Sequence, residues 1–204
     1  MAADMVELDV RRSADNVLIV HHDAHIAGVA INTMRADELP SYVPTLEAAL
    51  GACSGMDVNV EIKNSDDEPD YDPEQWVAGQ VVELLGRRPD HDRMLISSFD
   101  RSTINAVRAA DPTLRTGYLF VMPELVDGAT LRAFMEGVAA EGHVAIHPHW
   151  RAATTDLIDA AHACSLAVNA WTVDLPDELK LLAERGVDAL ITNTPDIARE
   201  VLGL

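Results

Sequence analysis

Two acidic residues stand one residue apart in an apolar segment near the start of the chain. Glu7 and Asp9 alternate with Leu8 and Val10 in the stretch MVELDV, a pattern that predicts a strand. Side chains two apart on a strand point the same way, so the two carboxylates share one face and the aliphatic residues share the other. We expect the aliphatic face to pack on helices and the acidic face to form a polar site at the end of the strand.

A second apolar segment, DVNVEIK (57–63), repeats this arrangement. Glu61 and Lys63 share one face, and we expect them to reach the same site as Glu7 and Asp9. Three carboxylates in an enclosed space repel one another and raise one another's pKa, and a hard divalent cation removes that penalty. Oxygen ligands favour Mg²⁺ or Ca²⁺ over zinc. The alternative is a set of unrelated acids at strand ends, paired with arginines.

His22 is the candidate general acid or base. It stands at the end of the apolar run NVLIVHH (16–22) and is followed by Asp23. A lone histidine is more often structural than catalytic, but the adjoining carboxylate and the short path back to the acidic strand favour a role in proton transfer. His21 should point to the opposite side and is the weaker candidate.

Further residues at the ends of apolar segments could line a pocket. Trp171 lies near the end of the segment 166–173. It either packs in the core or forms a pocket wall against the non-phosphate part of a substrate. His147 and His149 are similarly placed, and we expect neither to be catalytic.

Short apolar runs alternate with helical patterns along the chain, which predicts a parallel sheet with helices packed on it. The runs are nearly continuous, as in strands buried on both faces, and both an open doubly wound sheet and a closed barrel fit. The run 16–22 follows the first one after a short polar turn, so we expect a hairpin or extension there. The remaining seven strands are one fewer than a TIM (β/α)₈ barrel requires. The predicted strands are 5–10, 16–22, 57–63, 93–99, 114–120, 143–150, 166–173 and 188–192, and the predicted helices are 45–53, 73–87, 100–112, 127–142, 154–164 and 177–186.

Composition narrows the classes of partner. The chain has 204 residues and a formal net charge of −19, which argues against binding to nucleic acid or to anionic membranes but leaves room for a small phosphorylated substrate at a local positive site. No apolar run is long enough to span a bilayer.

The 2 cysteines form no disulfide framework, so we expect a cytoplasmic protein. The acidic run 64–74 is expected to be a solvated loop.

The stretch ELDVRRSADNVLIVHHD (7–23) resembles a motif of the glycerophosphodiester phosphodiesterase family, in which a Glu-x-Asp pair is followed by a polar turn, a strand and a His-Asp pair. The segments 43–50, 59–63, 170–174 and 186–196 are similar to later segments of the same family, so the resemblance covers the chain in order. It implies a TIM barrel that hydrolyses glycerophosphodiesters to an alcohol and glycerol 3-phosphate with a divalent cation.

The resemblance also implies roles for individual residues. Glu7, Asp9 and Glu61 would be the metal ligands, Lys63 would hold the phosphate, and His22 would be one of two histidines that transfer protons.

Members of this family begin with a strand that ends in a His-Arg-Gly motif, followed by a Pro-Glu-Asn segment and a first helix, and nothing similar precedes Met5. We therefore expect residues 1–204 to form a single barrel domain that lacks its first strand and helix, with weak or absent activity and a tendency to self-associate through open strand edges. The alternative is a barrel that binds a cation and phosphoesters without cleaving them. A lipid-cleaving phospholipase of the related toxin type fits the two cysteines less well.

Overall fold

The computed structural model describes residues 3–121 and 127–204. Two compact units divide the chain, an N-terminal unit of residues 4–116 and a C-terminal unit that contains residues 117–204. Each unit contains parallel strands with helices in the connections between them. No helix in the described parts is both long and apolar enough to cross a membrane.

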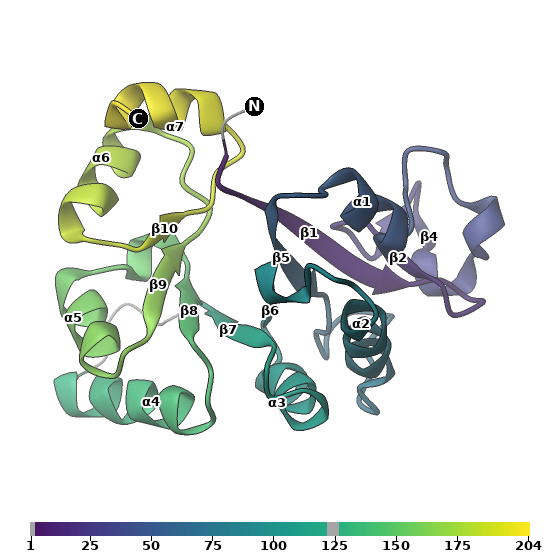
Figure 1. Cartoon of the computed structure of the whole chain (residues 1–204), viewed down its shortest axis with the longest axis horizontal. Coiled ribbons are helices and arrows are strands. Elements are labelled where there is room, and N and C mark those ends of the chain that lie inside the picture. Colours follow the sequence, from purple (N-terminus) through teal and green to yellow (C-terminus); the bar gives the residue numbers. More distant parts are fainter. Residues whose placement is uncertain (1–2, 122–126) are drawn as a thin grey trace. The chain divides into compact units, whose positions relative to one another are not determined.

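The N-terminal unit is built on a sheet with the strand order β6-β5-β1-β2 (Figure 1). β1, β5 and β6 run parallel, and β2 is antiparallel to β1 because the chain returns through a short turn. The predicted hairpin is therefore present, and a second small hairpin, β3–β4, follows it. The strands are β1 (Met5–Arg12), β2 (Leu18–Val20), β3 (His25–Ile26), β4 (Val29–Ala30), β5 (Asp57–Ile62) and β6 (Met94–Ser98).

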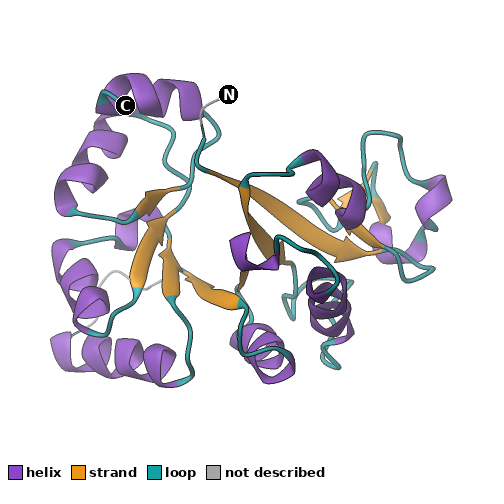
Figure 2. Ribbon diagram, in the orientation of Figure 1, coloured by secondary structure: helices purple, strands orange, loops and turns teal. Residues whose placement is uncertain are grey.

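The helices of this unit fill the connections between its parallel strands (Figure 2). Thr45 caps the first of them by accepting a hydrogen bond from the backbone of Ala48, and Asp100 caps the third in the same way from Ser102. The helices are α1 (Leu46–Ala52), α2 (Trp76–Gly86) and α3 (Arg101–Ala110), with short 3₁₀ turns at Ile31–Thr33, Ala36–Glu38 and His91–Arg93.

The C-terminal unit contains parallel strands in the order β7-β8-β9-β10, alternating with helices (Figure 1). The strands are β7 (Arg115–Phe120, whose first two residues belong to the N-terminal unit), β8 (Ala145–Pro148), β9 (Ala167–Ala170) and β10 (Ala189–Leu190). The helices are α4 (Gly128–Ala140), the 3₁₀ turn Trp150–Ala152, α5 (Thr155–Ala163), α6 (Pro176–Arg185) and α7 (Pro195–Leu202).

Every predicted strand and helix has a counterpart, whereas α7 and the β3–β4 hairpin were not predicted. Thr154 caps α5 by accepting a hydrogen bond from the backbone of Leu157. No side chain caps the start of α6. The residue at the cap position is Leu175, and Asp174 accepts hydrogen bonds from the segment that follows β10.

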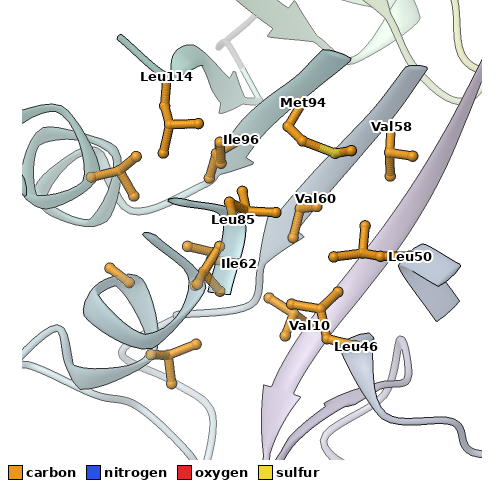
Figure 3. Close-up of a cluster of buried hydrophobic side chains, with 14 residues drawn as sticks. Val10, Leu46, Leu50, Val58, Val60, Ile62, Leu85, Met94, Ile96 and Leu114 are labelled. Atoms are coloured by element: carbon orange, nitrogen blue, oxygen red, sulfur yellow. The ribbon is translucent and has the colours of Figure 1, made fainter. Parts of the chain in front are cut away.

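One face of the N-terminal sheet forms an aliphatic core with the helices (Figure 3). Val10 of β1, Val60 of β5 and Ile96 of β6 are fully buried against Leu50 of α1 and Leu85 of α2. The aliphatic residues of MVELDV and DVNVEIK thus lie on the helix side, as the alternation predicted. The acidic residues of both strands are consequently left on the opposite face.

Truncation of Leu85 tests this core. Leu85→Ala removes a fully buried side chain and should lower the free energy of unfolding by about 2–5 kcal/mol, because it leaves a cavity between α2 and the sheet. Leu84→Ala is the matched control, since Leu84 is only partly buried in the same helix and should cost less. Urea denaturation followed by tryptophan fluorescence measures both. Equal losses for the two variants would contradict the assignment of the core face.

Candidate active site and metal centre

The register of β1 and β5 brings together the acidic residues predicted to meet. Glu7 lies opposite Asn59, and Asp9 lies opposite Glu61. Because the two strands are parallel and in register, side chains of the same parity point to the same face. One ligand oxygen from each of Glu7, Asp9 and Glu61 can be chosen so that all three lie within 4.8 Å of one another.

Lys63 continues this row past the end of β5. Its Nζ lies 3.0 Å from Asp9 Oδ1 and 2.6 Å from Glu61 Oε1. Burial alone would lower the pKa of Lys63, but the carboxylates of Glu61 and Asp9 outweigh it and raise that pKa above its ordinary value. The lysine therefore stays charged and neutralises part of the acidic group.

Charge repulsion nevertheless remains at the site. Burial, Asp9 and Glu61 together raise the pKa of Glu7 from 4.5 to about 8. Burial also raises the pKa of Glu61, although Lys63 opposes the change. In the absence of a cation, Glu7 thus holds a proton at neutral pH, because three carboxylates and one ammonium group would otherwise leave two uncompensated charges.

The donor atoms fit a divalent cation. They are all oxygens and lie within 4.8 Å of one another. Two oxygens bound to one Ca²⁺ ion at about 2.3–2.6 Å lie up to about 5 Å apart, whereas Mg²⁺ at about 2.0–2.1 Å would draw them to within about 4.2 Å. Glu7 Oε1, Asn59 Oδ1 and Ser97 Oγ are buried and have no hydrogen-bond partner within the described residues. Asn59 and Ser97 are the register neighbours of Glu7 and Glu61 on this face. Buried oxygens without partners are costly, and a cation with its water shell would satisfy them.

A pocket of about 260 Å³ adjoins this group. Glu61 and Lys63 form one wall, and the start of the acidic run together with Phe99 forms the rest. A small phosphodiester placed there would lie beside both the ammonium group of Lys63 and the carboxylates.

His22 lies on the loop that follows β2, and its side chain is 73% exposed. Its Nδ1 is 2.7 Å from Asp23 Oδ1, and this hydrogen bond is the main cause of the lowered pKa of Asp23. An Nδ1–H donated to Asp23 leaves Nε2 as the atom that exchanges protons with a substrate. His21 turns its ring back to the carbonyl of Asp23.

Arg11 is a residue of this region that we did not single out from the sequence. It follows Asp9 by two positions on the same strand and is 1% exposed. Its guanidinium donates to the carbonyl of His22 and to the carboxylates of Glu68 and Asp70. The signal in the sequence was the continuing alternation Glu7, Asp9, Arg11, which places the arginine on the acidic face.

The acidic run 64–74 is a loop, but the expectation that solvent surrounds it is wrong for part of its length. Asp72 is 5% exposed, and the side chain of Asp70 is likewise 5% exposed. Asp70 pairs with Arg11, and Asp72 accepts a hydrogen bond from the backbone of Val77 at the start of α2. Charged residues in this loop thus act as anchors, because buried cations and free backbone donors require partners.

Trp171 and the two histidines near it belong to the C-terminal unit. Trp171 Nε1 donates to the carbonyl of His147 at 2.7 Å, and the ring of His149 meets the indole edge-on at 5.2 Å between centroids. His147 is buried and its pKa falls to about 4, so it is neutral at physiological pH. A β-carbon at Gly117 would overlap the His147 ring, which explains the glycine at that position. The role of Trp171 as a pocket wall stays a prediction.

Comparisons with known proteins agree with the motif. The family model described as the glycerophosphoryl diester phosphodiesterase family matches residues 1–197. A Mycobacterium tuberculosis protein, named a probable glycerophosphodiester phosphodiesterase, is 28% identical over 97% of this chain and 78% of its own length. The glycerophosphodiester phosphodiesterase of Bacillus subtilis is 25% identical over 98% of this chain and 77% of its own length.

A solved structure shares the fold. A phosphodiesterase of Oleispira antarctica, determined in complex with the product sn-glycerol 3-phosphate, superposes with a TM-score of 0.84. The two chains are 22% identical, and the match covers 98% of this chain and 85% of the other. This likeness confirms the predicted α/β fold of the TIM-barrel type. Since the family model covers nearly the whole sequence, the chain belongs to the glycerophosphoryl diester phosphodiesterase family, whose members are phosphoric diester hydrolases.

Proposed function

We propose that this chain hydrolyses glycerophosphodiesters to glycerol 3-phosphate and an alcohol at the site formed by Glu7, Asp9, Glu61 and Lys63. Its family and the names of its relatives support this reaction. The observation that supports it most is the group of three carboxylates, whose ligand oxygens lie within 4.8 Å of one another. A charged lysine lies beside this group and lines the adjoining pocket.

Glu7, Asp9 and Glu61 would hold the cation, which we propose to be Mg²⁺ or Ca²⁺ because all the donors are hard oxygens. When bound, such an ion acts as a Lewis acid that stabilises negative charge on a phosphate oxygen. Lys63 supplies a second positive charge next to the phosphate, and a charged hydrogen bond of this kind is stronger than a neutral one.

His22 would transfer a proton at its Nε2 while Asp23 holds its Nδ1–H and fixes the tautomer. Hydrolysis breaks the bond between phosphorus and the oxygen of the alcohol, which gains a proton, while the attacking oxygen loses one. If water attacks, glycerol 3-phosphate forms directly; if the glycerol hydroxyl attacks, a cyclic phosphate forms first and water must then open it. Trp171 would contact the non-phosphate part of the substrate.

We also propose that residues 1–204 act as one domain. The weak turnover expected from the sequence is a further prediction.

Removal of one ligand tests the metal site. Asp9→Asn should abolish release of glycerol 3-phosphate from glycerophosphocholine. It should also weaken Mg²⁺ or Ca²⁺ binding by more than roughly 10–100-fold, which is the usual cost of losing a residue that only hydrogen-bonds to a metal ligand. EDTA should have the same effect on the wild type. Glu47→Gln is the control, since Glu47 is an exposed acid in the first turn of α1. Cation binding without any product from the wild type would instead favour the non-catalytic alternative.

The raised pKa of Glu7 predicts that cation binding depends on pH. At neutral pH the metal-free Glu7 carries a proton, and a cation must displace it. Affinity should therefore rise with pH up to about 8, by up to about tenfold per pH unit, and level off above that. Calorimetry in two buffers with different protonation enthalpies measures the released proton. Glu7→Gln should bind more weakly and with less pH dependence. Equal wild-type affinity at about pH 6 and about pH 8 would contradict the prediction.

Substitution of His22 tests the proton-transfer role. His22→Ala should lower kcat by about 10²–10⁴-fold, because general acid–base catalysis contributes that much, and should leave cation affinity unchanged. His162→Ala is the control, since His162 is a surface histidine of α5 paired with Asp188. A His22→Ala enzyme with wild-type kcat would exclude the proposed role.

A further inference from the structure

The segment that carries His22 is held to β1 by its backbone on both sides of the histidine. The backbone N–H of His21 donates to the carbonyl of Asp9 at 3.0 Å. The carbonyl of His22 accepts from Arg11 Nε at 3.0 Å and from Arg11 Nη2 at 2.7 Å. The imidazole itself is largely exposed, so its place over the acidic face depends mainly on where this backbone is fixed.

Arg11 is itself rigidly held. Its Nη1 donates to Glu68 Oε2 at 2.9 Å and to Asp70 Oδ2 at 2.8 Å, and its Nη2 also donates to Glu68 Oε1 at 3.0 Å. All three nitrogens of the guanidinium are thus engaged, and the side chain is 1% exposed. A planar fork held by two carboxylates can orient a carbonyl in a way that the single ammonium group of lysine cannot.

The geometry points to Arg11 as a positioning residue for His22, an inference that rests on the proposed function. Arg11 stands two positions after Asp9 on the strand that also bears Glu7. One strand therefore carries two of the three proposed cation ligands and the side chain that fixes the backbone of the proposed proton-transfer residue. Displacement of a catalytic group by about 1 Å can cost about 10²-fold in rate.

The first test is Arg11→Lys, which keeps the positive charge beside Glu68 and Asp70 but loses the fork. We expect kcat for glycerophosphocholine to fall by about 10²-fold, with KM and cation affinity changed far less. Arg12→Lys is the matched control. Arg12 is the next residue of β1, and its guanidinium lies over the ring of Trp76, 5.1 Å from the centroid. An Arg11→Lys enzyme with the kcat of Arg12→Lys would overturn the inference.

A double mutant separates positioning from a general effect on the fold. In a His22→Ala background there is no imidazole to position, so Arg11→Lys should cause no further loss of kcat. Independent losses that multiply would show that Arg11 does not act through His22. Asp70→Asn leaves the bonds from Arg11 to the His22 carbonyl in place and should cost much less than Arg11→Lys. An equal cost would mean that the effect passes through the acidic loop, and would also overturn the inference.

Amide hydrogen exchange provides a test that does not need activity. Arg11→Lys should speed exchange in the segment 21–24, where the His21 N–H bonds to Asp9, and Arg12→Lys should not. Unchanged exchange in 21–24 would contradict the anchoring itself. Failure of the wild type to hydrolyse any glycerophosphodiester would count against the proposed function, and the exchange data would still decide the inference about Arg11.

Discussion

Electrostatic repulsion among Glu7, Asp9 and Glu61 is the constraint on which the rest of this site depends. The three carboxylates are held together by the register of two parallel strands, and Lys63 compensates only part of their charge. The pKa of Glu7, raised to about 8, measures the remaining cost. Such an arrangement lowers the stability of the protein unless a proton or a cation is bound there. A site that is costly when empty and favourable when filled is what cation binding requires.

The aliphatic core and the acidic site are opposite faces of the same strands. Val58, Val60 and Ile62 bury one side of β5 under the helices, and this burial fixes the direction in which Asn59 and Glu61 point. A slip of one residue in the register would exchange the two faces, so a correct core also secures a correct site. The buried oxygens of Asn59 and Ser97 extend the polar face beside the carboxylates.

Charge is used differently in the loops of the N-terminal unit. The chain carries a net charge of −19, yet Arg11 and Lys63 place two cations beside the acidic face. Arg11 ties β1, the His22 segment and the acidic loop together through one guanidinium. Breaking a buried ion pair by removing one partner costs about 3–5 kcal/mol, because the remaining charge is left without a partner, so loss of Arg11 would disturb every segment that it joins. Precise loops around a rigid strand end are what the proposed hydrolysis would require.

The sequence by itself determined the elements and the face that each strand residue occupies, because alternation along a strand is a local property. Glu7 and Asp9 on one face, the hairpin after β1, and the strands and helices that follow were all readable in this way. The same alternation in DVNVEIK predicted that Glu61 would meet the first two acids, and the family resemblance added the roles of these residues. Only the tertiary structure decided the contacts made between distant segments. It paired Lys63 with Asp9 and Glu61, buried Asp70 and Asp72 in a loop that looked solvated, and turned Arg11 toward His22. Burial and pairing of a charge depend on which loops meet above a strand, and no periodicity in the chain encodes that meeting.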